Sequence, residues 1–152
     1  MQKHDVFLSF RGEDTRDTFT SHLYAALRLK RVGAYIDYRL AKGDEVSPAL
    51  AEAIRESKIS VIVFSENYAS STWCLDELVH ILSCKDENGQ LVVPVFYGVD
   101  PSHVRKQQGS YAAALAALEE RLAAAGIEKL RRWRRALTIA ASLSGWDSSV
   151  TK

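Results

Sequence analysis

A β-branched run leads into an amphipathic helical pattern at residues 59–82, ISVIVFSENYASSTWCLDELVHIL. The run at 59–65 has the length and composition of a buried strand. The pattern from residue 70 begins like a helix cap and continues with apolar residues at helical spacing. This stretch predicts a strand, a short loop and a helix. It leaves open what the adjacent acids Asp76 and Glu77 do.

Three further β-branched or aromatic runs repeat this alternation, DVFLSF at 5–10, AYID at 34–37 and LVVPVFY at 91–97. Strands that alternate with helical patterns predict a parallel sheet with helical crossovers, and hence an α/β domain. Open parallel sheets bind ligands beyond the carboxyl ends of their strands. The loops that follow the strands are therefore the first place to look for a site.

The helices between these runs have recognisable start and stop signals. The helix after the first strand is expected to begin at residues 14–15 and to end at Gly33. Ser47 as N-cap and Pro48 at the first helical position open the next helix, which is expected to run through Ser57.

The C-terminal third predicts an irregular connection and two helices. Residues 98–110 are rich in turn formers, and two strong helical patterns follow on either side of Gly126. We expect one domain over residues 1–147 and the start of a linker or tail at 148–152.

Charge and length restrict the class of protein. The 152 residues include 20 Lys and Arg against 19 Asp and Glu, a formal charge of +1, which argues against a dedicated nucleic-acid or membrane-surface protein. There is no apolar run near 18 residues, and the first ten residues do not resemble a secretory signal. We therefore expect an intracellular, cytoplasmic protein without a membrane segment.

Both cysteines fall on the helix predicted from residue 70. Cys74 and Cys84 are ten residues apart, which is about 15 Å at the usual helical rise. Because a disulfide requires Cα atoms within roughly 7 Å, we expect two reduced thiols, as in a reducing compartment.

Several familiar sites are absent from the sequence. The first strand-to-helix turn reads SFRGEDTR rather than G-x-G-x-x-G, and there is no P-loop and no G-x-S-x-G elbow. Phe64-Ser65-Glu66 stands where a response-regulator receiver would carry its phospho-acceptor aspartate. The histidines and cysteines have no metal-ligand spacing, so we expect no metal ion. A carboxylate-centred site or a pure interaction domain remains.

A helical wheel separates the two acids of the opening stretch. Its apolar arc, which is expected to face the sheet, consists of Leu75, Leu78, Val79 and Leu82. Asp76 and His80 lie almost opposite this arc, so we interpret both as part of a solvated face.

Glu77 lies on the flank of the arc, one turn from Trp73 and one turn from Ile81. Apolar surroundings should favour the protonated acid. A carboxyl group at this point can act in proton transfer or stabilise a developing cation, although boundary glutamates are also common. Arg11, after the first strand, either binds phosphate or neutralises the acids that follow it.

Long segments at 5–27, 34–78 and 92–111, together with RRWRRALTIAASLSGWD at 131–147, closely resemble the plant Toll/interleukin receptor (TIR) domain. The resemblance implies a flavodoxin-like α/β fold with the second strand beside the first, then the third and the fourth. It also implies a short fifth edge strand, which the sequence does not place. In plants such domains form the N-terminal signalling module of nucleotide-binding leucine-rich-repeat immune receptors, or occur with little else attached.

The family is known for NAD⁺ nucleohydrolase activity, which yields nicotinamide and ADP-ribose or cyclic variants that trigger cell-death signalling. NAD⁺ is then a consumed substrate and no cofactor is needed; use of NADP⁺ stays open. The glutamate of the family's W-C-L-x-E-L motif is catalytic, and Glu77 matches it. A non-catalytic TIR scaffold that signals through homotypic contacts is the alternative.

The resemblance also assigns roles to other residues. The expected NAD⁺-binding residues are Phe10, Arg11, Gly12, Ser70 and Trp73.

Two further positions match the family's self-association features. The loop at 38–46 corresponds to one that gates the site and contacts a neighbouring protomer, with Arg39, Lys42 and Gly43 as candidates. Ser21 and His22 match a pair used in self-association. By resemblance the partners are other TIR domains, and the location is the cytoplasm with the nucleus as a second compartment.

The segment KLRRWRRAL at 129–137 admits a third interpretation, because five basic residues surround Trp133 as on some nucleic-acid-binding surfaces. Near-neutral total charge instead favours a solvated basic face on a helix that Trp133 anchors. Nucleic-acid binding is therefore not expected.

Overall fold

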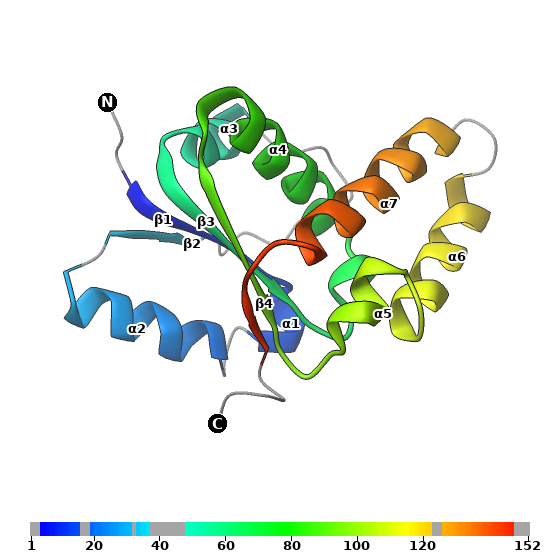
Figure 1. The fold of residues 1–152 in the computed structure, drawn as a ribbon, viewed down its shortest axis with the longest axis horizontal. Helices are drawn as coiled ribbons and strands as arrows, with labels where there is room; N and C mark the ends of the chain where they lie inside the picture. Colours follow the sequence, from blue (N-terminus) through cyan, green and yellow to red (C-terminus); the bar gives the residue numbers. More distant parts are fainter. Residues whose placement is uncertain (1–3, 16–18, 32, 37–47, 123–125, 148–152) are drawn as a thin grey trace.

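The structure is a computed structural model that describes residues 4–15, 19–31, 33–36, 48–122 and 126–147. Its centre is a parallel five-stranded sheet in the order β2-β1-β3-β4-β5 (Figure 1). The strands are β1 (His4–Ser9), β2 (Ala34–Ile36), β3 (Ser57–Phe64), β4 (Leu91–Phe96) and β5 (Trp146–Asp147). The predicted α/β class, the parallel strands and the order of the first four strands are confirmed.

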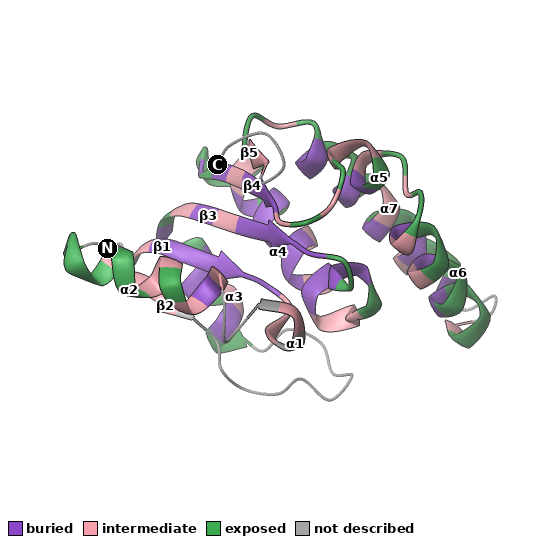
Figure 2. Ribbon diagram, turned by 90° about the horizontal axis from the view of Figure 1, so that it is seen from below, coloured by how far each residue is buried: buried purple, intermediate pink, exposed green. Residues whose placement is uncertain are grey.

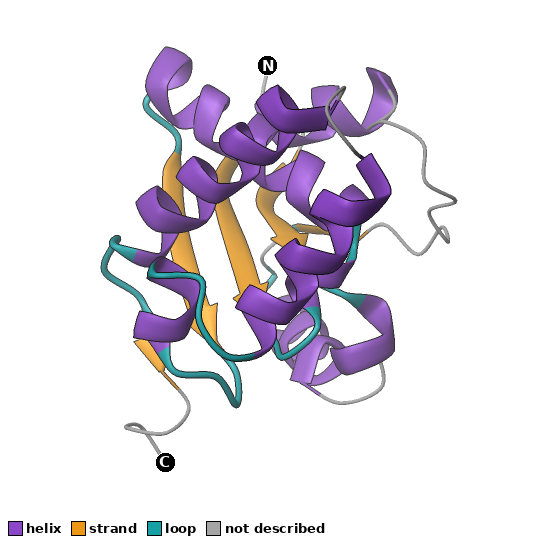
Figure 3. Ribbon diagram, turned by 90° about the vertical axis from the view of Figure 1, so that its right-hand side faces the viewer, coloured by secondary structure: helices purple, strands orange, loops and turns teal. Residues whose placement is uncertain are grey.

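Helices cover the two faces of the sheet unequally. One face carries α2 (Ser21–Leu29), whereas the other carries α3 (Pro48–Arg55), α4 (Thr72–Asn88) and α7 (Ile127–Ala141) (Figures 1 and 3). Three short elements, α1 (Gly12–Thr15), the 3₁₀ turn η2 (Tyr68–Ser70) and α5 (Pro101–Arg105), follow carboxyl ends of strands, and α6 (Ser110–Leu122) packs beside α7.

Side-chain alternation along β1 explains the two cores. Phe7 packs in the large core under α3, α4 and α7, whereas Val6 and Leu8 pack in the smaller core under α2. The neighbouring strand β3 is buried at its carboxyl end from Ile62 to Phe64. Figure 2 shows β1 and β3 largely buried and much of α6 exposed. The loops at these carboxyl ends are thus held by the most buried strands.

The first predicted helix is wrong in its extent. The structure has the four-residue α1 followed by α2, and α2 ends at Leu29 rather than at Gly33. Arg31 adopts the left-handed conformation, with φ of 59°, that terminates the helix. Gly33 instead leads into β2, and its N–H donates to Asp5 Oδ2 at 2.9 Å.

Ser57 is also misplaced by the sequence prediction. Helix α3 ends at Arg55, and Ser57 is the first residue of β3. Its hydroxyl donates to the Ala53 carbonyl at 2.8 Å, which satisfies one of the last carbonyls of α3. A serine that caps a helix from outside has no periodic signal, so the pattern extended the helix by one half-turn.

The remaining predictions differ in outcome. The connection at 98–110 contains no long helix, as expected, but Asp100 caps the short helix α5 by accepting from the Ser102 N–H at 2.8 Å. The two C-terminal helices separated by Gly126 are confirmed. The fifth strand is Trp146–Asp147, parallel to β4 at the sheet edge.

Some predicted features lie outside the described residues, namely the N-cap Ser47 and the loop residues Arg39, Lys42 and Gly43. The tail at 148–152 is likewise outside them. Within the described residues, no helix is both long enough and apolar enough to cross a membrane.

Candidate functional site

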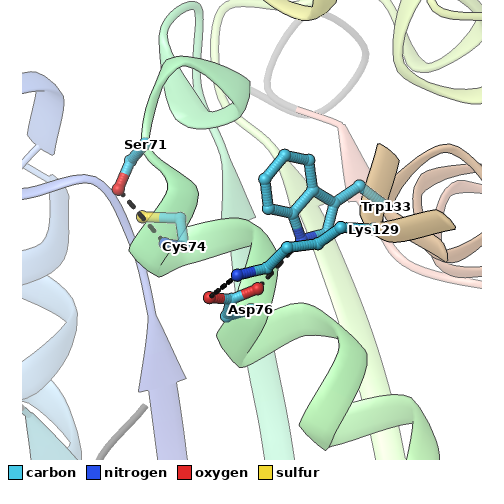
Figure 4. A network of polar contacts seen from close by, with 5 residues as sticks. All are labelled: Ser71, Cys74, Asp76, Lys129 and Trp133. Carbon is cyan, nitrogen blue, oxygen red and sulfur yellow. Dashed lines mark hydrogen bonds and ion pairs between the residues drawn. The ribbon is translucent and has the colours of Figure 1, made fainter. Parts of the chain in front are cut away.

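Helix α4 begins at Thr72, directly after the loop that follows β3. The side chain of Ser71 is the N-cap and accepts a hydrogen bond from the Cys74 N–H at 3.1 Å (Figure 4). The predicted helix and its cap are therefore confirmed. The cap is Ser71, one residue after the predicted start at residue 70. This start places Glu77 in the second turn, facing the carboxyl end of β1.

Both carboxyl oxygens of Glu77 are held by hydrogen bonds. Ser9 Oγ donates to Oε1 at 2.8 Å, and the indole Nε1 of Trp73 donates to Oε2 at 3.0 Å. The residue is only 4% exposed. The surroundings of Glu77 are thus more polar than its neighbours on the helical wheel indicated.

A fully buried tyrosine lies behind Ser9. The hydroxyl of Tyr68 is 2.8 Å from Ser9 Oγ and donates to the Cys74 carbonyl at 3.1 Å. Burial raises the pKa of Tyr68 well above its ordinary value, and the nearby Cys74 and Glu77 add to this effect. Tyr68 therefore stays a neutral phenol in the physiological range.

Cys74 joins α4 to the loop after β1. Its thiol lies 3.5 Å from the Phe10 carbonyl, which accepts the S–H. Burial, together with the negative charge of Glu77, raises the pKa of Cys74 to about 12. The thiol is therefore a structural donor and not a nucleophile. Cys74 and Cys84 are both free thiols on α4, as predicted, and both are buried.

Asp14 ties the loop after β1 to the loop after β3. One oxygen, Oδ2, accepts from Ser65 Oγ at 2.6 Å and from the Asn67 N–H at 2.8 Å. The other, Oδ1, accepts from Asn67 Nδ2 at 3.2 Å. Tyr111 from α6 donates to the Ser65 carbonyl at 2.7 Å and so supports the same loop. These contacts fix the rim around Glu77.

Among the expected NAD⁺-binding residues, Trp73 lies directly against Glu77. Trp73 is half-buried and bonds to it directly. Arg11 and Gly12 are half-buried in the loop after β1, whereas Ser70 is exposed at the end of η2. The Phe10 side chain packs in the core under α2, so its carbonyl is the part that faces α4.

Asp76 corrects the helical-wheel prediction. Its carboxylate accepts the indole N–H of Trp133 at 2.9 Å and lies 3.7 Å from Lys129 Nζ (Figure 4). The side chain is 14% exposed rather than solvated, because α7 packs across this face of α4. His80, on the same side of the wheel, is exposed as predicted.

The same contacts decide the interpretation of the basic segment on α7. Trp133 is 1% exposed, so its ring is not available for stacking on a base. Arg131 pairs with Glu128 at 3.0 Å, and Arg134 lies 3.9 Å from Glu119. The prediction that Trp133 anchors the helix is confirmed, and the nucleic-acid interpretation loses its aromatic component.

Sequence reasoning missed Ser9, Tyr68 and the full role of Asp14. Ser9 had one available signal, since it is the polar residue that follows the apolar run at residues 6–8, at the carboxyl end of β1. Tyr68 had none beyond its place after the third strand. Among the described residues, no group of three or more His, Cys, Asp or Glu could hold a metal ion.

The fold and this geometry define a parallel α/β domain with a buried carboxyl group at the carboxyl ends of its central strands. The family model for the TIR domain matches residues 3–152. The chain therefore belongs to the TIR-domain family, as its motifs suggested.

Its relatives are plant disease resistance proteins. The chain is 57% identical to "Disease resistance protein RPV1" of Vitis rotundifolia over 94% of its length, and this covers 10% of that protein. It is 52% identical to "TMV resistance protein N" of Nicotiana glutinosa over 93% of its length, covering 12% of that protein. The chain thus spans about a tenth of the length of these relatives.

Solved structures agree with the family. The TIR domains in the structure of the activated Roq1 resistosome, which directly recognises the effector XopQ, match with a TM-score of 0.90 at 51% identity, over 98% of this chain and 90% of that one. The TIR domain of the Toll-related receptor TRR-2 of Hydra magnipapillata matches with a TM-score of 0.51 at 19% identity, over 64% of this chain and 74% of that one. This second likeness concerns the fold alone.

Proposed function

We propose that this TIR domain is an NAD⁺ nucleohydrolase in plant immune signalling, with Glu77 as its catalytic residue. The observation that supports this proposal is the position of Glu77. It is a buried carboxyl group at the carboxyl end of β1, with each oxygen held by a neutral donor. Buried acids beside the loops at the carboxyl ends of a parallel sheet are candidates for functional sites.

The reaction suits a single carboxylate. When the nicotinamide–ribose bond of NAD⁺ breaks, nicotinamide leaves as a neutral molecule and the ribose gains oxocarbenium character. A fixed negative charge beside the ribose stabilises that cation, and the same carboxylate can orient a ribose hydroxyl or accept the proton of an attacking water. The leaving group needs no proton, so a second acid is not required. The products are nicotinamide and ADP-ribose, or a cyclic variant.

Residues around Glu77 have matching roles in this proposal. Trp73 offers an indole face to the nucleotide while its N–H orients Glu77. Arg11, in the half-buried loop after β1, supplies positive charge for the pyrophosphate. Gly12 and Ser70 line the entrance. NADP⁺ is the alternative substrate to be compared with NAD⁺ in the same assay.

Self-association belongs to the same proposal. Ser21 is half-exposed and His22 is exposed on α2, so both are accessible to a second TIR domain. The Roq1 structure is of an assembled resistosome with its TIR domains. We propose that homotypic association completes the site, that the loop with Arg39, Lys42 and Gly43 takes part, and that the protein acts in the cytoplasm.

The test is nicotinamide release from purified protein at high concentration with a crowding agent and NAD⁺. We expect release from the wild type and at least a 100-fold loss in Glu77→Gln. Glu87→Gln, an exposed substitution on the same helix, is the matched control and should keep wild-type release. No release from the wild type, or undiminished release from Glu77→Gln, would contradict the proposal.

A non-catalytic scaffold is the second candidate, and it is supported by the exposure of His22. In that case the hydrogen bonds of Glu77 serve packing alone. Cell death that persists in Glu77→Gln but disappears in His22→Ala would favour the scaffold over the enzyme.

A further inference from the structure

Ser9 is a fully buried hydroxyl between two other polar groups. It closes β1, is 0% exposed, and lies 2.8 Å from both Glu77 Oε1 and Tyr68 Oη. Burying a hydroxyl is costly unless it is hydrogen-bonded. An alanine at this position would give β1 an uninterrupted apolar end, so the presence of serine calls for a reason beyond folding.

The contacts form a linear chain from Glu77 through Ser9 and Tyr68 to the Cys74 carbonyl. Each hydroxyl has one proton to donate and can also accept. When Glu77 is ionised, Ser9 donates to it, and Tyr68 can donate its single proton to Ser9 in place of the Cys74 carbonyl. When Glu77 is protonated, the acid can donate to Ser9, Ser9 to Tyr68 and Tyr68 to the carbonyl. The chain therefore matches both charge states of Glu77.

Trp73 supplies the second point of attachment. Its indole fixes Oε2, while Ser9 fixes Oε1. The terminal side-chain torsion of a glutamate adopts a broad range of angles. One hydrogen bond therefore leaves the carboxyl plane free to rotate. Two donors from different elements, one on β1 and one on α4, define that plane. Tyr68 is held by ring contact with Phe64 at 5.1 Å, so the Ser9 hydroxyl rests on a rigid support.

We propose that Ser9, supported by Tyr68, is a positioning residue that sets the carboxyl plane of Glu77 for NAD⁺ cleavage. This inference rests on the proposed function. Ser9 acts through Glu77 and does not bind substrate itself, because it lies beneath the carboxyl group with no exposed surface. Its effect should therefore fall on the chemical step and not on substrate binding.

The test compares two buried serines on neighbouring strands. Ser9→Ala should lower kcat for nicotinamide release roughly 10-fold or more while KM stays within about twofold, because a misplaced catalytic group slows the chemical step. The matched control is Ser60→Ala. Ser60 is also 0% exposed and donates to Gln90 at 2.8 Å, away from Glu77. It should lose similar stability and keep its kcat.

Three outcomes of this comparison would overturn the inference. They are an unchanged kcat in Ser9→Ala, a raised KM with unchanged kcat, and an equal loss of kcat in Ser60→Ala. If Ser9→Ala yields little folded protein, Tyr68→Phe keeps the ring and removes only the supporting hydroxyl. It should lower kcat less than Ser9→Ala is expected to, and an unchanged kcat would equally count against the inference.

A stability cycle separates this inference from the proposed function. Ser9→Ala, Glu77→Ala and the double variant, each of which removes the Ser9–Glu77 hydrogen bond, are compared by thermal unfolding without NAD⁺. If Ser9 holds Glu77, the double variant should lose less Tm than the sum of the single losses. If the wild type releases no nicotinamide, the proposed function fails, while additive losses in this cycle would independently refute the Ser9–Glu77 coupling.

Discussion

Asp76 and Glu77 are adjacent in the sequence but belong to different regions of the molecule. Each carboxylate accepts an indole N–H, at 2.9 Å from Trp133 and at 3.0 Å from Trp73. Trp133 comes from α7, 57 positions along the chain, whereas Trp73 is on the same helix four positions earlier. Asp76 therefore joins two helices, and Glu77 joins a helix to the sheet through Ser9.

The two acids also differ in their other neighbour, which is Lys129 for Asp76 and Ser9 for Glu77. Asp76 lies 3.7 Å from the Lys129 ammonium, which offsets its charge at the edge of the helix pair. Ser9 is a neutral hydroxyl, so it orients Glu77 without cancelling its charge. A carboxylate that must stabilise a cation needs neutral donors, whereas one that joins two helices gains from a cation. Asp76 therefore docks α7 on α4, and under the proposed function Glu77 carries the chemistry.

The largest effect on nicotinamide release should come from replacing the carboxyl group of Glu77 by an amide. Glu77→Gln should reduce nicotinamide release by at least about 100-fold, because the amide carries no negative charge toward the ribose. Asp76→Asn should keep release within about threefold, since the amide oxygen can still accept from Trp133. Chromatography of nicotinamide at matched protein concentration measures both. Equal losses in the two variants would remove the distinction.

The next effect concerns stability at the Asp76 side. Asp76→Ala leaves the buried Trp133 N–H without its acceptor, so the free energy of unfolding should fall by about 1–3 kcal/mol. Asp86→Ala, an exposed change on the same helix, should stay within about 0.5 kcal/mol. Urea unfolding monitored by circular dichroism gives both values. Equal stability of the two variants would mean that the Asp76–Trp133 bond does not help dock α7.

A smaller effect on the free energy of unfolding is expected from removing the ammonium group of Lys129. Lys129 is 37% exposed on its side chain and also lies over the Trp133 ring at 5.6 Å. Lys129→Met should lower the free energy of unfolding by less than about 1 kcal/mol, because solvent screens a partly exposed pair. The difference from wild type should shrink in high salt. A larger, salt-independent loss would instead indicate that the stem of Lys129 contributes packing between α7 and α4.

The smallest effect is expected at Cys74, whose thiol should not react with an alkylating reagent in the folded protein. Because burial raises the pKa of Cys74 to about 12, its thiolate should be negligible at pH 8. Alkylation of native protein at pH 8 should leave Cys74 unmodified, and unfolding in urea should expose it to the reagent. Peptide mass spectrometry measures the modified fraction. Rapid native modification of Cys74 would show that this side of α4 opens to solvent.

Local pattern determined much of this protein in advance. The alternation of β-branched runs with helical periods predicted the parallel α/β fold, and the resemblance to TIR domains implied the order of four strands. The wheel placed Glu77 on the flank beside Trp73, because residues four apart on one helix are always neighbours. The fold class and the position of Glu77 follow from period and spacing, which are properties of residues close together in the sequence.

Tertiary structure decided the features that depend on distant segments. The partner of Asp76 comes from α7, the partners of Glu77 include a residue of β1, and the two-residue strand Trp146–Asp147 exists only because β4 offers an edge. A two-residue strand is too short to show a period, and the wheel contains no information about a helix that packs from elsewhere. The sequence identified Glu77 as the candidate, but only the fold showed that Ser9 contacts its carboxyl group and that Tyr68 contacts Ser9.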